Sequence, residues 1–140
     1  MSALYTAVAT STGDGRNGKA RTDDGLLVVD LAVPKEMGGA GGATNPEQLF
    51  AVGYSACFHS ALKGVASRSK TPISDTSVTA EVSLNRVADG GFQLSVALHV
   101  ELAGVDQQTA DKIVEQAHQV CPYSNATRGN IEVTVDATIG

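Results

Sequence analysis

One stretch limits the possible folds of this chain more than any other: between Gln48 and Lys63 it carries no Lys, Arg, Asp or Glu. Residues 45–48, Asn-Pro-Glu-Gln, come directly before it and are typical of a helix N-terminus, with a capping side chain, a proline at the first helical position and a Gln three residues after the cap. The pattern predicts a helix from about Pro46 to about Ser69, ended before Pro72. Because apolar residues cover most of its circumference, we expect this helix to be buried all round.

Strand patterns precede the helix. The segment Leu4–Thr12 leads into a glycine-rich turn at residues 13–18, and Leu26–Val33 is a β-branched apolar run ended by Pro34. These patterns predict a hairpin or small meander whose second part is a well-buried strand. The segment from Pro34 to Thr44 contains four glycines, at 38, 39, 41 and 42, and predicts a mobile loop.

Alternation returns after the helix, in Val78–Leu84 and Phe92–Leu102, and predicts a long antiparallel hairpin. Asp106 is expected to cap a second helix that ends at Pro122, and Ile131–Ala137 alternates as a last strand. This order favours a single α+β domain over residues 1–140, with antiparallel sheet around a long central helix. One sheet covers only one side of that helix, so we expect another subunit to cover the other side.

Composition excludes several classes of function. With 140 residues the chain has the size of one domain, and Lys+Arg 10 against Asp+Glu 15 gives a net charge of -5 with no basic stripe. A nucleic-acid partner is therefore not expected, since phosphate binding needs a concentrated positive face. No basic leader or long apolar run is present, so we expect a soluble, intracellular protein that is not bound to a membrane.

Two other motifs are weak. Residues 13–18 match the glycine pattern of dinucleotide sites, but no helix N-terminus is predicted after them to receive a pyrophosphate. Cys57-x-His59 and His118-x-x-Cys121 together suggest a zinc site, yet residues two apart on a helix point about 200° from each other and do not readily hold one ion. Surface or hydrogen-bonded histidines are the favoured interpretation, with His99 as a solvated side chain on a strand.

The two cysteines are the most informative part of the composition. Cys57 lies in the apolar helix, where burial raises the pKa of a thiol, and Cys121 lies at the end of the second predicted helix. Two free cysteines in such a protein are usually structural, and a reactive thiolate also needs a nearby cation. Taken alone, these residues leave redox chemistry as one open alternative.

Longer motifs around both cysteines point to a family. GGAGGATNPEQLF at 38–50, GYSACF at 53–58 and VCPYSNATRGN at 120–130 resemble the organic hydroperoxide resistance (Ohr) branch of the OsmC/Ohr family. The likeness extends over essentially the whole chain. It implies the OsmC/Ohr fold, an intertwined homodimer with active sites at the interface, and a cytoplasmic thiol-dependent peroxidase that reduces organic hydroperoxides. No bound cofactor is implied, and the expected reductant is an external dithiol, above all a lipoylated protein.

Carried over by position, the resemblance implies roles for four residues. Cys57 is the expected peroxidatic thiol and Cys121 the resolving thiol, which form a disulfide during turnover. Arg16 is the expected activating cation and Glu47 its carboxylate partner. A non-catalytic small-ligand or zinc-binding protein on the same fold is the alternative.

Two further expectations concern the geometry of the site. Leu49, Phe50 and Phe58 are candidates to bind the alkyl tail of a substrate, although plain core packing explains such residues equally well. Glu47 and Cys57 lie about 15 Å apart along one continuous helix, too far for direct contact. We therefore predict that Arg16 and Glu47 serve the Cys57 of the partner subunit.

Overall fold

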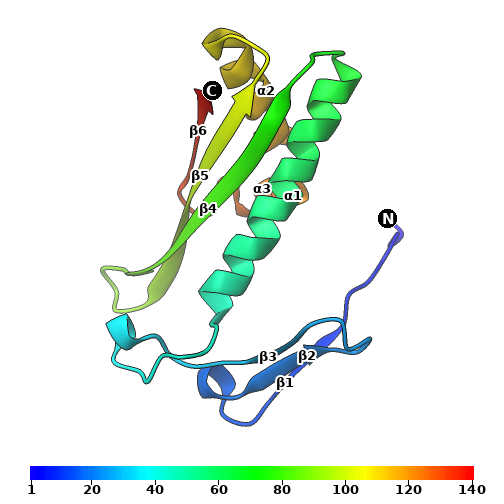
Figure 1. The fold of residues 1–140 in the computed structure, drawn as a ribbon. Coiled ribbons are helices and arrows are strands. Elements are labelled where there is room, and N and C mark those ends of the chain that lie inside the picture. Colours follow the sequence, from blue (N-terminus) through cyan, green and yellow to red (C-terminus); the bar gives the residue numbers. More distant parts are fainter. The chain divides into compact units, whose positions relative to one another are not determined.

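The computed structural model describes all residues, Met1 to Gly140, as an α+β fold with two three-stranded sheets and three α-helices (Figure 1). The chain divides into two compact units, residues 1–49 and 50–140. Helix α1 (Pro46–Arg68) begins in the first unit and continues through the second. No helix is long and apolar enough to cross a membrane. The expectation of one domain over residues 1–140 stays a prediction.

The first unit contains an antiparallel meander, as the sequence predicts. Strands β1 (Ala9–Thr12), β2 (Lys19–Thr22) and β3 (Val28–Asp30) pair in chain order. The prediction of a well-buried strand here is wrong for most of the run: Leu26 is 88% and Val28 66% exposed, and only Leu31 is buried. The three short strands have no second layer within their own unit, so their apolar side chains stay uncovered.

The glycine-rich segment forms a 3₁₀ turn, Lys35–Met37, and otherwise irregular backbone that returns beside β3 through a bridge between Leu31 and Thr44. Helix α1 then starts at the residue that the sequence indicates. The side chain of Asn45 accepts a hydrogen bond from the backbone N–H of Gln48 at 2.9 Å, which satisfies one of the free donors of the first turn.

Helix α1 is not buried all round, which corrects the sequence prediction. Its buried residues, Tyr54, Phe58, Leu62, Val65 and Ala66, follow the three- and four-residue spacing of one helix face. The stripe Val52, Ala56, Ser60 and Lys63 follows the same spacing on another face and is exposed. The second unit has enough residues to cover only one side of this helix.

The second unit is built on the predicted hairpin. Strands β4 (Ser74–Arg86) and β5 (Phe92–Ala103) are antiparallel, and the pairs Val78↔Val100, Ala80↔Leu98 and Val82↔Val96 place apolar residues opposite each other on the core side. Strand β6 (Val133–Ile139) pairs parallel to β5, so the expectation of purely antiparallel sheets is wrong. Two helices intervene between β5 and β6, and this long crossover returns the chain in the same direction.

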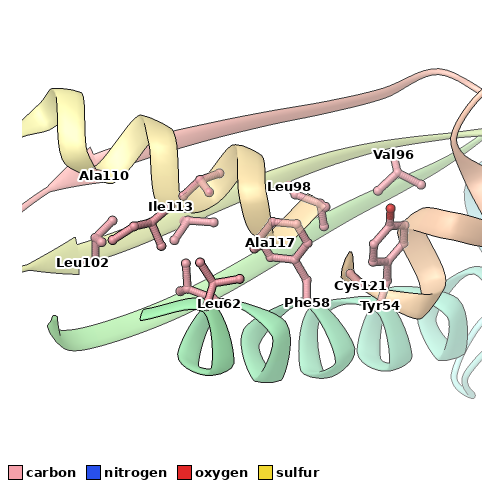
Figure 2. Close-up of a cluster of buried hydrophobic side chains, with 13 residues drawn as sticks. Tyr54, Phe58, Leu62, Val96, Leu98, Leu102, Ala110, Ile113, Ala117 and Cys121 are labelled. Carbon is pink, nitrogen blue, oxygen red and sulfur yellow. The ribbon is translucent and has the colours of Figure 1, made fainter. Parts of the chain in front are cut away.

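Helix α2 (Gln107–Val120) is capped by Asp106, whose side chain accepts from the backbone N–H of Thr109, as predicted. Cys121 follows its last residue, and Pro122 opens a short helix, α3 (Pro122–Thr127), which the sequence pattern did not predict. The core lies between α1, β5 and α2, where Phe58 and Leu62 of α1 meet Leu98 of β5 and Ala117 of α2 (Figure 2). Burying a side chain such as Phe or Leu contributes about 1.5–3 kcal/mol, so this cluster holds α1 firmly against the sheet and α2.

Candidate thiol site

Cys57 lies in the middle of α1, half-buried and one residue before the fully buried Phe58. Its side chain faces an open pocket of about 350 Å³. The pocket walls come from α1 and from the junction of α2 and α3, and Arg68 is their one charged residue. The lining residues are Cys57, Ser60, Ala61, Gly64, Arg68, Val120 and Pro122. The first predicted thiol is therefore accessible to a small molecule from one side.

Cys121 is fully buried at the point where α2 ends and α3 begins. Its backbone is extended, with φ -64° and ψ 124°, which lets the chain turn between the two helices. The Sγ atoms of Cys121 and Cys57 are 3.7 Å apart, and both cysteines are free. A disulfide requires about 2.05 Å between its sulfurs, so the two thiols are reduced and less than 2 Å from bonding distance.

The surroundings of Cys57 determine how readily it ionises. Burial raises the pKa of the Cys57 thiol, the backbone N–H of Tyr123 lowers it, and the neighbouring Cys121 raises it further. The net direction is upward, because the desolvation of a thiolate outweighs one amide dipole. These surroundings therefore favour the neutral thiol of Cys57 over its thiolate.

The predicted cation and its carboxylate partner are paired in the first unit. Arg16, on the 3₁₀ turn Gly15–Asn17, donates two hydrogen bonds to Glu47 in the first turn of α1, at 2.9 and 2.7 Å. This two-pronged contact lowers the pKa of the Glu47 carboxyl and raises that of the Arg16 guanidinium. Fork-like pairing fixes the plane of a guanidinium as well as its position. Whether this pair acts on a thiolate stays a prediction.

The three candidate tail-binding residues occupy different surroundings. Phe58 is fully buried in the core, where packing accounts for it, and its role as a substrate-binding residue stays a prediction. Phe50 lines a second pocket, of about 370 Å³, between α1, α3 and the turn end of β5, which does not include Cys57. Leu49 is half-buried at the end of the first unit.

The docking of α3 on α1 depends on residues that the sequence analysis did not assign to the site. The ring of Tyr123 packs over Gly53, where an added Cβ would lie 2.6 Å from the tyrosine oxygen. Tyr54, fully buried, hydrogen-bonds to Ser124 and Thr127 of α3. The available signal was a tyrosine inside an apolar helix, since a buried phenol needs polar partners.

The histidines do not form a metal site with the cysteines. His59 pairs with Thr76 of β4 at 2.7 Å, and His118 pairs with Ser124 at 2.8 Å. His99 is partly exposed as expected, but it is not merely solvated: Glu81 and Asp136 flank it at 2.6 and 2.7 Å. No three His, Cys, Asp or Glu side chains are grouped so that they could hold a metal ion. The glycine motif at 13–18 leads into β2, with no helix N-terminus for a phosphate beyond its one 3₁₀ turn.

Comparisons with known proteins agree with the motifs. Residues 39–136 match the family described as OsmC-like protein. The organic hydroperoxide resistance protein of Xanthomonas axonopodis pv. citri is 50% identical over 134 residues, which cover 94% of this chain and 93% of that protein.

Solved structures are similar over nearly their whole length. An organic hydroperoxide resistance protein of Legionella pneumophila, also described as a predicted redox protein, has a TM-score of 0.94 and 54% identity, with 98% of this chain and 99% of that chain covered. One from Elizabethkingia anophelis has a TM-score of 0.94 and 50% identity, with 100% of both chains covered.

Proposed function

Since this chain belongs to the OsmC-like protein family, we propose that it is a thiol-dependent peroxidase that reduces organic hydroperoxides. Relatives similar over more than nine-tenths of the chain are named organic hydroperoxide resistance proteins. The observation that carries the proposal is the pair of free thiols, 3.7 Å apart, one facing a pocket and the other buried behind it. This is the arrangement that a reacting and a resolving cysteine require.

In the first step, Cys57 acts as the peroxidatic residue. Its thiolate attacks the terminal oxygen of the hydroperoxide, an S–O bond forms, and the O–O bond breaks. The departing alkoxide takes up a proton and leaves as an alcohol. Cys57 is oxidised to the sulfenic acid, and the peroxide is reduced by the same two electrons.

In the second step, Cys121 resolves the sulfenic acid. Its sulfur attacks Cys57 Sγ, the S–S bond forms, the S–O bond breaks, and the oxygen leaves as water with the proton of the Cys121 thiol. The 3.7 Å separation requires only a small approach of the two sulfurs. Because Cys121 is buried, it meets Cys57 in preference to external oxidants. An external dithiol, by our proposal a lipoyl group, then reduces the disulfide.

The raised pKa of Cys57 makes an activating cation necessary. We assign this role to Arg16, held in a fixed plane by Glu47. A guanidinium stays charged on partial desolvation and stabilises the negative charge that develops as the O–O bond breaks. The distance of about 15 Å between Glu47 and Cys57 along one helix supports action on the partner's Cys57, in a homodimer with two sites.

Substrate preference follows from the surroundings of the thiol. The Cys57 pocket combines Ala61, Val120 and Pro122 with the polar Ser60 and Arg68, so the apolar part of its wall offers a contact to an alkyl group that hydrogen peroxide lacks. The exposed stripe on α1 begins with Val52 and Ala56 and supports burial against a second copy of the chain.

Thiol counting during turnover tests the proposal. Reduced wild-type protein treated with one equivalent of cumene hydroperoxide should lose both free thiols and release cumyl alcohol. Cys57→Ser should abolish turnover with dihydrolipoamide, whereas Cys121→Ser should still consume one peroxide and stop as the sulfenic acid. Turnover that survives Cys57→Ser would refute the assignment, and zinc bound stoichiometrically to the thiols would favour the alternative. Mixing Cys57→Ser with Arg16→Gln chains should restore partial activity if the cation acts across subunits.

A further inference from the structure

A buried cluster of polar side chains comes from residues within one helical turn of Cys57 and Cys121. The Tyr54 hydroxyl hydrogen-bonds to Ser124 Oγ at 2.8 Å and to Thr127 Oγ1 at 3.1 Å. Ser124 Oγ also pairs with His118 Nδ1 at 2.8 Å. Tyr54 and Ser124 are fully buried. Burying hydroxyl groups gains little over a well-packed apolar core even when every one is paired, so hydrophobic packing alone does not explain this cluster.

The cluster joins the same elements as the thiols. Tyr54 precedes Cys57 by one turn of α1, and Ser124 follows Cys121 in the first turn of α3. His118 adds the last turn of α2. Three elements therefore meet at one set of hydrogen bonds, within one turn of each cysteine.

Helix α3 depends on such contacts for its position. A helix of six residues is too short to be stable alone, so docking decides where its N-terminus lies. That N-terminus supplies the backbone N–H of Tyr123, which is the group that lowers the pKa of Cys57. The residue before it is Cys121. A displacement of α3 would alter both the ionisation of Cys57 and the distance to its partner sulfur.

We propose that the hydrogen-bonded cluster of Tyr54, Ser124 and His118 positions the thiol pair, by fixing the N-terminus of α3 against α1. These are positioning residues, because their side chains hydrogen-bond to one another and not to either sulfur. Burial lowers the pKa of His118, so its ring is neutral near pH 7 and the cluster acts through geometry rather than charge. The consequence for turnover rests on the proposed peroxidase function, whereas the consequence for the ionisation of Cys57 does not.

Two variants remove one hydroxyl each: Tyr54→Phe and Ser124→Ala. Thr76→Val is the matched control, because it removes a hydroxyl that also pairs with a histidine of α1, at 2.7 Å, but on the β4 side and away from α3. The rate of Cys57 alkylation by iodoacetamide is measured against pH in a Cys121→Ser background. Each of these hydroxyls makes two hydrogen bonds, and loss of even one corresponds to about a fivefold change in an equilibrium. The alkylation profile of the two test variants should therefore move to higher pH by about half a unit or more.

The second measurement uses cumene hydroperoxide and both cysteines. Disulfide formation after oxidation should slow by about three- to tenfold in Tyr54→Phe and Ser124→Ala, with more sulfinic acid at Cys57, while Thr76→Val matches wild type. Circular dichroism establishes that each variant is folded, and either test variant suffices. Profiles and rates equal to those of Thr76→Val overturn the positioning proposal. If the thiols of the wild-type protein do not react with cumene hydroperoxide, the proposed function is refuted. The alkylation profile then still tests the positioning proposal, because it does not depend on the peroxide.

Discussion

Replacing Gly53 by alanine tests the contact between α1 and α3 at a single atom. A Cβ at this position would lie 2.6 Å from the hydroxyl oxygen of Tyr123, and 3.1 and 3.2 Å from two of its ring carbons. Ordinary van der Waals contact begins at about 3.4 Å, so the tyrosine oxygen must withdraw by about 0.8 Å. Tyr123 follows Cys121 by two residues, and its ring packs against Tyr54 with centroids 5.6 Å apart. The displacement therefore acts on the element that carries the resolving thiol.

Two opposing effects set the size of the stability change. Alanine is better than glycine inside a helix by about 1 kcal/mol, because glycine loses more backbone entropy on folding. Overpacking of a closely packed site costs about 1–3 kcal/mol. We expect a net change between zero and about 2 kcal/mol of destabilisation for Gly53→Ala. Gly64→Ala is the matched control for stability, since it gains the same helix propensity and its added Cβ meets only the flexible side chain of Arg68, at 3.3 Å.

The assay combines urea unfolding with thiol kinetics. Gly53→Ala should unfold at lower urea than Gly64→Ala, and should form the Cys57–Cys121 disulfide more slowly than wild type after oxidation. Adding Tyr123→Phe to Gly53→Ala removes the nearest contacting atom and should recover part of both losses, as a double-mutant cycle would show. A Gly53→Ala protein as stable as Gly64→Ala, with wild-type disulfide kinetics, would refute the reasoning that Gly53 is required for the docking of α3.

Three further predictions use ionisable and capping groups. Arg16 lowers the pKa of Glu47, so the pair stabilises the fold above the ordinary carboxyl pKa and loses this effect as pH falls through the lowered value. Glu47→Gln should lower the free energy of unfolding by at most about 1 kcal/mol at pH 7, because the Arg16 side chain is 40% exposed to solvent. In strong acid the variant and wild type should be equally stable, so a stability difference that grows as the pH falls would contradict this. Glu81, and then Asp136, raise the pKa of His99, so the protonated ring stabilises the fold at low pH and loses this effect as pH rises. Urea unfolding should show His99→Gln as less stable than wild type at pH 5 and equally stable at pH 9. A stability difference found only at pH 9 would contradict this. Asp106→Ala removes the acceptor 2.8 Å from the Thr109 N–H and should lower the urea concentration at the midpoint of unfolding, whereas an unchanged midpoint would mean that the cap is dispensable.

Local signals in the sequence were sufficient for most elements. Asn45 and Asp106 mark helix starts because capping is a contact between near neighbours, and the structure has both caps. Alternation located β4 and β5 for a similar reason, since the two faces of a strand differ along a few residues. The direction of β6 was missed because alternation is the same in parallel and antiparallel strands. Helix α3 was missed because a proline after a helical pattern is normally taken as the end of that helix. Pro122 is also the first residue of the next helix, and only the residues after it could indicate this.

The candidate site was predictable only as far as motifs extend. The sequence identified Cys57 and Cys121, which the fold brings within 3.7 Å across an interval that no local pattern spans. It also named Arg16 and Glu47, which form the expected ion pair. The burial of Phe58 was not predictable, because an aromatic residue next to a cysteine looks the same in sequence whether it faces a pocket or the core. The polar partners of Tyr54 were missed because they come from a helix about 70 residues away in the sequence. The exposed stripe of α1 has no sequence pattern that indicates what packs against it.

The proposed function requires Cys57 to ionise, and the surroundings of its sulfur oppose this. Burial holds its pKa high and the Tyr123 N–H only partly opposes this, so an arginine must approach the sulfur for the thiolate to exist at neutral pH. Arg68 lines the same pocket, but it follows Cys57 by about three turns, or roughly 16 Å along the helix axis, beyond the reach of an arginine side chain. It also has no carboxylate partner to fix its plane, unlike Arg16. A guanidinium held in one plane by a carboxylate can stabilise a developing negative charge without first losing conformational freedom. The raised pKa of Cys57 is therefore the reason that our proposal assigns the cation to Arg16, whose guanidinium is held in one plane by Glu47.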